Sequence, residues 1–384
     1  MRRHTNGSAE LFNEGSEYKP RHVNTSRIPF QNSLDFLRFA FAFIVLLVHA
    51  YEISENKVLA PIKSYLDSGV AVQAFFVISG FLIVMSYERS KSVLDYLAKR
   101  AQRIYPAYFF VVLACAGFGV FLSTHPPQEY FLSPGWFKYL AANLAFLNFL
   151  HPSLPGVFSQ NPFQAVNGPL WTIKIEVMFY LSVPFISWLL RKTPKFWTLL
   201  TLYALSLLYF SVLTWAGHAY DRPIFFELAK QFPGQLAFFI SGSALFYYFE
   251  TFSKHQPTIV LSSMFFYFIA PLMGFSVLAP ASLAVIIIFL AFNLPLLNHF
   301  GKIGDLSYGI YIYHFPVLQI FIAYGLFSKQ PGVSLLLVCI LVLTMAALSW
   351  HFLEKRFLWS SRHRDSDHEA AVLSPHPGVY PSVR

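Results

Sequence analysis

The first long apolar run of the sequence contains two ionisable residues, Arg38 and His49, that are eleven positions apart. Three helical turns place them on nearly one face of a helix, roughly 16 Å apart along its axis. Arginine binds anionic groups, and histidine transfers protons near neutral pH. Ionisable residues within membrane segments usually belong to functional sites, so we expect His49 to be a working residue. Two structural roles stay open, a headgroup anchor for Arg38 and a hydrogen bond within the bundle for His49.

Asp35 precedes Arg38 by three positions, in the first turn of the same predicted helix. A carboxylate at this point suits the positive end of the helix dipole. The spacing also allows an ion pair with Arg38, which makes Asp35 a secondary site candidate.

A second basic pair, Arg100 and Arg103, is three positions apart and can face one ligand. Two guanidinium groups can hold phosphate groups bidentately. Positive charge at this point also follows from membrane topology, so the spacing alone is a weak functional signal.

A carboxylate lies near the start of a later apolar run, where Gly168 and Pro169 break the chain. Glu176 falls in the second turn of this predicted span and needs a partner, such as a histidine, an arginine or a lysine. Lys174 is two positions away and does not face it on a helix, which favours a partner on another span. The predicted topology places Glu176 and His49 at similar depth.

A second histidine, His314, lies two residues before Pro316 in another apolar run. The proline loosens the local backbone and can expose carbonyl groups. His314 is therefore a secondary site candidate, with a structural role as the alternative. The pair Ser79 and Gly80, in contrast, predicts a close contact between two helices.

The composition indicates that this chain lies in a lipid bilayer. Hydrophobic residues make up 55% of it and charged residues 12%, with a mean hydropathy of +0.50, whereas a soluble domain carries about a quarter charged residues. The net charge of +9 comes from basic residues beside the apolar runs, so no nucleic-acid partner is expected. Cys115 and Cys339 lie within apolar runs, so neither a disulfide framework nor a metal site is expected. We expect an all-α, polytopic transmembrane bundle in a lipid bilayer.

About ten stretches are long and apolar enough to cross the hydrocarbon core, which takes about 20 residues. The apolar stretch 139–150 is short for a crossing and is expected to be re-entrant or interfacial. If it did not cross, the basic loops at 89–103, 191–195 and 355–356 would all lie in the cytoplasm, as the positive-inside rule requires. The predicted spans are 34–51, 70–87, 104–122, 170–190, 196–213, 235–252, 258–274, 281–297, 303–325 and 333–353.

The ends of the chain are polar. Residues 1–31 show no cleavable signal peptide and are expected to form a cytoplasmic tail. Residues 361–384, rich in Ser, Pro, His and charge, are expected to form a disordered cytoplasmic tail. Residues 32–360 form the predicted membrane domain between them, with both termini inside.

Six ordered motifs resemble the acyltransferase-3 family of integral membrane acyltransferases. They are the first span from Leu34 to His49, FFVISGFLI, the RxxRIYPxY entry to the third span, NGxLWTxxxEVxFY, SYGIYIYHFPV, and a closing element at 353–357. Each motif is weak alone, but their order and spacing, from residue 33 to about 357, are specific.

The resemblance implies O-acylation, usually O-acetylation, of a cell-envelope or exported saccharide, which can be lipid-linked, at the bacterial inner membrane. The acyl group would come from cytoplasmic acyl-CoA such as acetyl-CoA, a co-substrate rather than a bound cofactor. Matching the family's motifs, His49 and Glu176 are expected to be catalytic, with His49 acting as a general base or carrying the acyl group. Arg38, Arg100 and Arg103 are expected to bind the donor, and Trp171, Asp35 and His314 are secondary candidates.

The sequence departs from the family pattern at three points. Lys174 and Val177 replace residues of the SVEE-type version, which places the chain closer to the branch of exopolysaccharide and oligosaccharide modifiers. Arg356 stands where proline is usual. We expect no periplasmic SGNH-type domain after the membrane domain, which is then expected either to complete the transfer itself or to work with a separate periplasmic transferase or as a homo-oligomer.

Two other functions stay open. A transporter or flippase for a lipid-linked saccharide would use the same buried charges as a substrate path, although no internal repeat is obvious. A different acyl transfer, such as succinyl transfer to glucans or acylation of a macrolide, would use the same fold.

Overall fold

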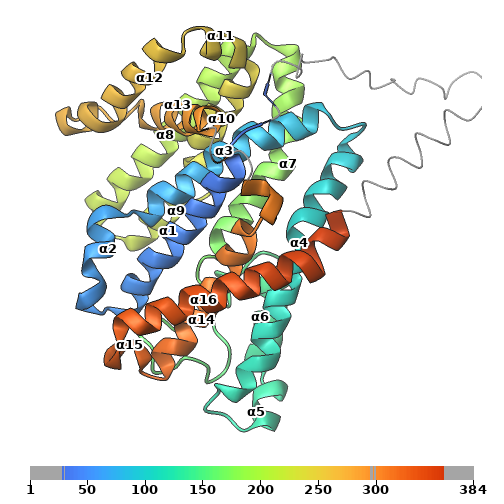
Figure 1. Ribbon diagram of the computed structural model, residues 1–384, viewed down its shortest axis with the longest axis vertical. Helices are drawn as coiled ribbons and strands as arrows, with labels where there is room; N and C mark the ends of the chain where they lie inside the picture. Colours follow the sequence, from blue (N-terminus) through green and yellow to red (C-terminus); the bar gives the residue numbers. More distant parts are fainter. Residues whose placement is uncertain (1–27, 30, 295–296, 298–299, 359–384) are drawn as a thin grey trace, which may run out of the picture.

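The computed structural model describes residues 28–29, 31–294, 297 and 300–358, and within this part of the chain it is a bundle of helices (Figure 1). Among these residues, extended pairing is limited to one isolated bridge between Ser123 and Val157. The α-helices are α1 (Leu34–Ser54), α2 (Ala60–Tyr65), α3 (Ser68–Glu88), α4 (Val93–Phe118), α5 (Pro127–Leu132), α6 (Pro134–Leu144), α7 (Leu170–Lys192), α8 (Lys195–Tyr220), α9 (Pro223–Ala229), α10 (Phe232–Tyr247), α11 (Phe249–Lys254), α12 (Gln256–Met264), α13 (Ala279–Asn293), α14 (Ser307–Ala323), α15 (Leu326–Lys329) and α16 (Pro331–Ser349).

The predicted all-α membrane class is confirmed. Seven helical segments of the described chain are long and apolar enough to cross a membrane. In a bilayer a helix satisfies its own backbone hydrogen bonds, which explains why such apolar segments are helical. The three remaining predicted spans correspond to the shorter helices α10, α13 and α14, so each of the ten predicted stretches is largely helical. The chain is a multi-pass membrane protein, and the number of ten crossings stays a prediction. The seven segments are Leu34–Ser54, Ser68–Glu88, Val93–Phe121, Leu170–Lys192, Lys195–Tyr220, Gln256–Met273 and Pro331–Leu358.

Two predicted helix starts were wrong in ways that matter for the site. Helix α4 begins at Val93 instead of residue 104, because the Ser92 hydroxyl caps it by accepting a hydrogen bond from Asp95 N (3.1 Å). The basic segment with Arg100 and Arg103 is therefore already helical. Helix α14 begins at Ser307 instead of residue 303, which leaves the residues just before it in a loop.

Two other predicted spans are less regular than expected. The stretch 235–252 is interrupted at Tyr248, between α10 and α11. The stretch 258–274 starts as α12 and continues as a π-helical segment, Phe265–Ile269, and a 3-10 turn, Ala270–Met273. In both stretches the prediction was wrong about the continuity of the helix, which hydropathy does not predict.

The short apolar stretch 139–150 contains the end of α6, an 11-residue helix that is too short for a full crossing. Figure 1 shows α5 at the bottom of the molecule, and α6 packs alongside the C-terminal half of α4, where the Tyr108 hydroxyl donates to Asn143 O (2.8 Å). The predicted tails, 1–31 and 361–384, lie almost wholly outside the described residues.

The basic loops after α3 and after α7 lie at one end of the bundle, as the charge argument requires. Arg191 Nη2 lies 3.3 Å from Glu88 Oε2, and the guanidinium lies 5.9 Å from the ring centre of Tyr87. The side of the membrane on which this end lies stays a prediction.

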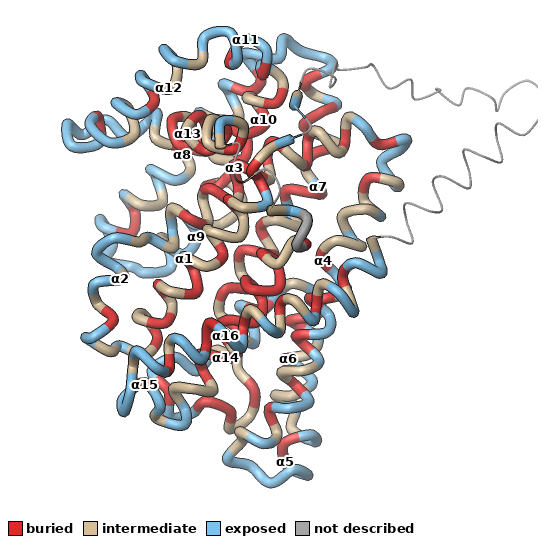
Figure 2. The backbone as a smooth tube through the Cα atoms, viewed as in Figure 1, coloured by how far each residue is buried: buried red, intermediate tan, exposed pale blue. Residues whose placement is uncertain are grey.

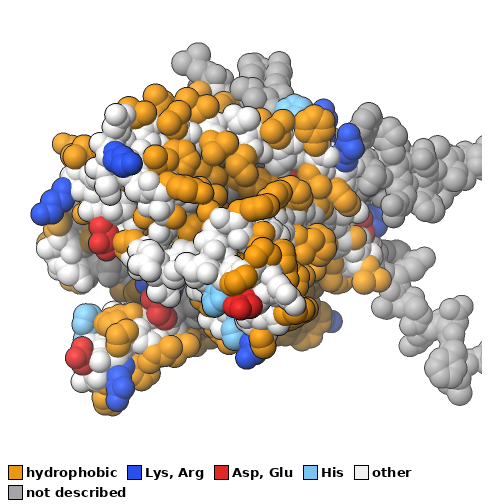
Figure 3. Space-filling model, turned by 90° about the horizontal axis from the view of Figure 1, so that it is seen from below, with side chains coloured by type: hydrophobic (Ala, Val, Ile, Leu, Met, Phe, Trp, Pro, Cys, Tyr) orange, Lys and Arg blue, Asp and Glu red, His pale blue; other side chains and the backbone are white. Residues whose placement is uncertain are grey.

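Helix α14 is deeply buried in the bundle. Its nine consecutive residues from Ser307 to Phe315 are all buried, and Figure 2 shows this segment among the buried parts of the molecule. It packs against α1 on one side and α16 on the other. Helices α8 and α12 bury few of their residues. Seen from below, hydrophobic side chains cover much of the molecular surface and charged side chains are few (Figure 3), as expected for a surface solvated by lipid.

The predicted close contact at Gly80 is confirmed, and its partner is α10. A Cβ atom built on Gly80 would lie 2.0 Å from Phe239 O, and one built on Gly242 would lie 2.0 Å from Val77 O. The Ser243 hydroxyl also donates to Gly80 O (3.2 Å). Small residues thus let the backbones of α3 and α10 touch.

We predict that Gly80→Ala destabilises the protein by at least about 1–3 kcal/mol, because the added methyl group forces two backbones apart. Thermal unfolding of the detergent-solubilised protein measures the effect. The matched control is Gly117→Ala in α4, where a Cβ atom meets nothing within 4 Å. Equal melting temperatures for the two variants would contradict the prediction.

Candidate active site

Two histidines from distant parts of the chain face each other inside the bundle. His49 Nδ1 of α1 lies 2.8 Å from His314 Nε2 of α14. The rings are nearly parallel, with 5.1 Å between their centres, and the ring of Phe315 packs edge-on against His49 at 5.8 Å. His314 is fully buried, whereas His49 is partly exposed. The accessible member of the pair is the histidine that the sequence favoured.

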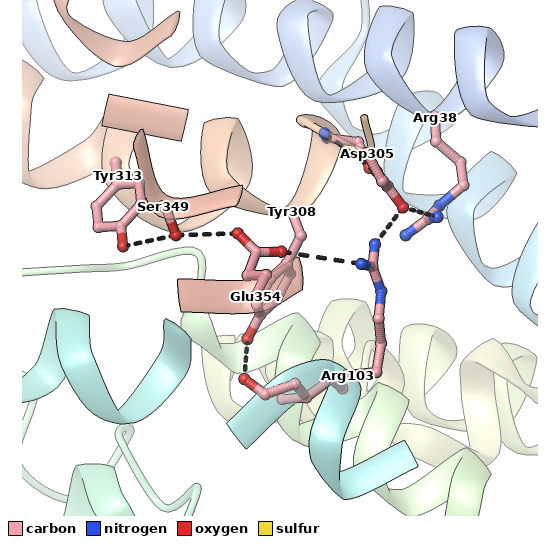
Figure 4. A network of polar contacts seen from close by, with 9 residues as sticks. Arg38, Arg103, Asp305, Tyr308, Tyr313, Ser349 and Glu354 are labelled. Carbon is pink, nitrogen blue, oxygen red and sulfur yellow. Dashed lines mark hydrogen bonds and ion pairs between the residues drawn. The ribbon is translucent and has the colours of Figure 1, made fainter. Parts of the chain in front are cut away.

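A second polar cluster surrounds Asp305, in the loop just before the N-terminal end of α14 (Figure 4). Asp305 Oδ2 accepts from Arg38 Nη1 and from Arg103 Nη2. Its other oxygen, Oδ1, accepts from Ser307 N (3.2 Å) and from the Ser307 hydroxyl (2.5 Å). One carboxylate thus connects α1, α4 and α14, and its charge offsets the two buried cations in part.

The cluster extends from Arg103 toward α16. Arg103 Nη1 lies 3.8 Å from Glu354 Oε2, and the Ser349 hydroxyl donates to Glu354 Oε1 (2.9 Å). The Tyr313 hydroxyl donates in turn to Ser349 Oγ (3.2 Å). Glu354 is 2% exposed. Figure 4 shows the chain of contacts from Arg38 through Arg103 and Glu354 to Tyr313.

The order of these contacts gives the relative direction of α1 and α14. Arg38 contacts Asp305 before α14 starts, and His49 contacts His314 seven residues into α14. The two helices therefore run in the same direction, and each of the two predicted functional residues of α1 meets a partner on or just before α14.

A cavity of about 50 Å³ lies beside the Asp305 cluster, large enough for a few water molecules or one small polar group. Glu176 lines it from α7, and Oε1 of Glu176 accepts from the Tyr180 hydroxyl (2.6 Å). Tyr311 also lines it, bonds Thr172 Oγ1 through its hydroxyl (2.7 Å), and has its ring centre 5.8 Å from that of His314. Tyr311 thus lies between the cavity and the histidine pair. The lining residues are Arg38, Val72, Phe75, Phe76, Ser79, Thr172, Ile173, Glu176, Ser307, Tyr308 and Tyr311.

Arg100 lies on α4, close to the Tyr180 side chain that bonds Glu176. Its guanidinium is 5.9 Å from the ring centre of Tyr180. Arg100 Nε is buried and has no hydrogen-bond partner among the described residues. Of the three predicted donor-binding arginines, Arg100 is thus the one whose guanidinium forms no hydrogen bond to a carboxylate of the described chain, whereas Arg38 and Arg103 both bond Asp305.

Several predicted pairings take another form in the structure. Within the described chain, Arg38 pairs with Asp305, and the Asp35–Arg38 pair that the spacing allows is not formed. Asp35 is exposed. Of the partners left open for Glu176, a histidine is not the one found among the described residues, because His49 contacts His314 and Glu176 lines a cavity with Arg38. Trp171 packs as a partly buried residue against the apolar core.

Three residues of the site were missed in the sequence: Asp305, Tyr311 and Glu354. A signal existed for Asp305, since an acidic residue two positions before Ser307 at the start of an apolar run predicts a local capping contact. Nothing in the sequence indicates that two arginines, 267 and 202 positions away, share its carboxylate.

The interior of the membrane bundle thus holds a histidine pair, an arginine–carboxylate cluster and a small cavity. A family model described as an acyltransferase domain matches residues 31–353. The chain therefore belongs to the acyltransferase-3 family, as the ordered motifs indicate, and is an acyltransferase.

Three relatives cover most of the chain. An O-acetyl transferase of Shigella phage Sf6 is 27% identical over 86% of this chain and 97% of its own. Nodulation protein 10 of Rhizobium leguminosarum bv. viciae is 25% identical over 85% of this chain and 92% of its own. The exopolysaccharide production protein ExoZ of Rhizobium meliloti is 27% identical over 76% of this chain and 90% of its own. No solved structure matches the chain.

We predict that Asp305→Asn lowers the free energy of unfolding by about 3 kcal/mol, because it removes the carboxylate paired with the largely buried Arg38 and leaves Arg103 with only the more distant Glu354. The side chains of Arg38 and Arg103 are 20% and 14% exposed, which places the expected loss at the lower end of the range for buried pairs. Chemical unfolding in detergent measures it.

The control is Glu227→Gln, which breaks an exposed ion pair with Lys230 (3.0 Å) and should cost no more than about 1 kcal/mol. A loss at Asp305 no larger than this control would contradict a structural role for the Asp305 cluster.

Proposed function

We propose that this protein transfers an acetyl group from cytoplasmic acetyl-CoA to a hydroxyl group of a cell-envelope or exported saccharide. The observation that carries the proposal is the His49–His314 pair in the interior of an acyltransferase-family bundle. The chemistry is suggested by the phage relative, whose name states O-acetyl transfer, and the acceptor class by the relative named for exopolysaccharide production.

The arginines would hold the donor. Coenzyme A carries phosphate groups, which guanidinium groups bind well. Arg100 has a buried, unpartnered Nε. Arg38 and Arg103 each use one N–H group on Asp305 and retain others of their five for an anion. The donor would therefore enter at the end of the bundle where α1 and α4 begin, with its slender thioester arm directed toward His49.

His49 would act as the general base. It removes the proton from the acceptor hydroxyl, whose oxygen then forms a bond with the thioester carbonyl carbon. The C–S bond breaks as the intermediate collapses, and the proton passes from His49 to the departing thiolate. The products are the O-acetylated saccharide and free coenzyme A, and His49 returns to its neutral state.

Glu176 would act at the cavity rather than on His49. Its carboxylate accepts from Tyr180 and keeps lone pairs for a further donor. A sugar hydroxyl in the cavity could therefore donate to Glu176. Transport of a lipid-linked saccharide, the alternative from the sequence, would not explain why the chain belongs to an acyltransferase family.

We predict that His49→Ala lowers acetyl transfer at least about 10²- to 10⁴-fold, the usual contribution of a general base. The measurement is acetyl-CoA-dependent labelling of saccharide by membranes that contain equal amounts of each variant. The control is His255→Ala, at an exposed position between α11 and α12, which should retain full activity. Wild-type activity of His49→Ala would refute the assignment.

We predict that Arg100→Gln raises the KM for acetyl-CoA about 10- to 100-fold, because a hydrogen bond to a charged group contributes about 1.5–3 kcal/mol. The turnover number at saturating donor should change much less, since Arg100 does not touch the reacting atoms in this scheme. Initial rates against donor concentration separate the two. An unchanged KM would remove Arg100 from the donor site.

A further inference from the structure

We infer that His314 is a positioning residue that fixes the tautomer of His49, so that the proton of neutral His49 lies on Nδ1 and the lone pair on Nε2 reacts. The inference rests on the proposed function for its chemical meaning, but its evidence is the geometry of the two rings. It specifies one atom of the site and a role for a buried residue.

The chain of hydrogen bonds starts at the backbone. His314 Nδ1 lies 3.1 Å from Ile310 O, one turn earlier in α14. A carbonyl oxygen can only accept, so the proton of this bond belongs to His314 Nδ1. A neutral imidazole carries one N–H group, and His314 Nε2 is therefore an acceptor.

The second step transfers this assignment to α1. His314 Nε2 accepts, so the atom 2.8 Å away, His49 Nδ1, must donate. Neutral His49 then carries its proton on Nδ1, and its Nε2 has a free lone pair. In the opposite arrangement, His314 Nδ1 would turn a lone pair toward the carbonyl oxygen of Ile310. Two acceptors would then face each other at a fully buried residue, with no hydrogen between them.

The packing around the pair keeps this arrangement in place. His314 is fully buried, and the rings of Tyr311 and Phe315 pack against it at 5.8 and 6.3 Å. Gly168, at the start of the α7 region, lies so close to Phe315 that a Cβ atom there would be 3.1 Å from the ring. His314 cannot turn away from His49 without repacking this wall.

The arrangement has a chemical consequence for the proposed step. A base must present a lone pair to its substrate, and a histidine in the wrong tautomer presents an N–H group instead. Here one nitrogen of His49 is committed to His314, and no hydrogen bond to Nε2 is found among the described residues. After Nε2 takes the proton of the acceptor hydroxyl, the Nδ1–H group still donates to His314 and stabilises the imidazolium.

The first test reads the tautomer directly. In protein with ¹⁵N-labelled histidine, neutral His49 should show a protonated Nδ1 and an unprotonated Nε2, with its signals assigned by their loss in His49→Asn. His314→Leu should move the proton of His49 to Nε2, the form favoured by a free histidine side chain. A protonated Nε2 on His49 in the wild-type protein would overturn the inference.

The second test uses two variants at one position. Gln can place an amide oxygen where His314 Nε2 accepts, whereas Leu fills space but accepts nothing. We expect His314→Gln to keep kcat within about tenfold of wild type and His314→Leu to lower it about 10²-fold or more. Equal losses in the two, at equal expression and melting temperature, would contradict a role through hydrogen-bond acceptance.

A matched control is present in the chain. His351 Nδ1 lies 2.9 Å from Ala347 O, the same kind of bond to the preceding turn, but His351 is exposed. His351→Leu should retain wild-type activity. The tests also separate the inference from the proposed function: retained acetyl transfer in His49→Ala sinks the function, whereas a wrong tautomer in a protein that needs His49 sinks only the inference.

Discussion

Polar groups inside a bilayer have to find their hydrogen-bonding partners within the protein, because lipid supplies none. In this chain many of those partners lie on α14 or just before it. Asp305 receives Arg38 and Arg103, and His314 receives His49. The same helix bonds Thr172 through a tyrosine hydroxyl and receives an amide hydrogen bond from Asn167 at Ile312 O (2.8 Å). The helices that carry the candidate site residues, α1, α4 and α7, are therefore held in place by contacts with α14 or with the loop just before it.

This dependence sets a fixed distance between the two halves of the proposed reaction. Arg38 and His49 belong to one helix; His49 bonds α14, and Arg38 bonds Asp305 in the loop just before α14. Neither residue can shift alone along the membrane normal without breaking its contact to α14 or to this loop. The spacing between Arg38 and His49 along the bundle is thus set by the geometry of α1.

The fold class could be predicted from the sequence, and candidate site residues could be proposed from it, because both leave local signals. Ionisable residues stand out within apolar runs, and motif order adds specificity, so His49, Arg38 and Glu176 could be named as site candidates. Pairing was harder to predict, since it depends on which helices meet, and the partner of His49 is 265 positions away. Helix ends were wrong where a capping residue rather than hydropathy decides them, as at Ser92. Asp305 was missed for both reasons: it lies just before a helix start, and its arginine partners are far away in the sequence.

The long sequence separation between α1 and α14 has a consequence for biosynthesis. A ribosome adds about 5–20 residues per second, so α1 is made on the order of tens of seconds before α14. During that interval Arg38 and His49 belong to a newly inserted helix whose bonding partners do not yet exist. A nascent or truncated chain that ends before α14 therefore lacks the partners that both residues have in the folded protein.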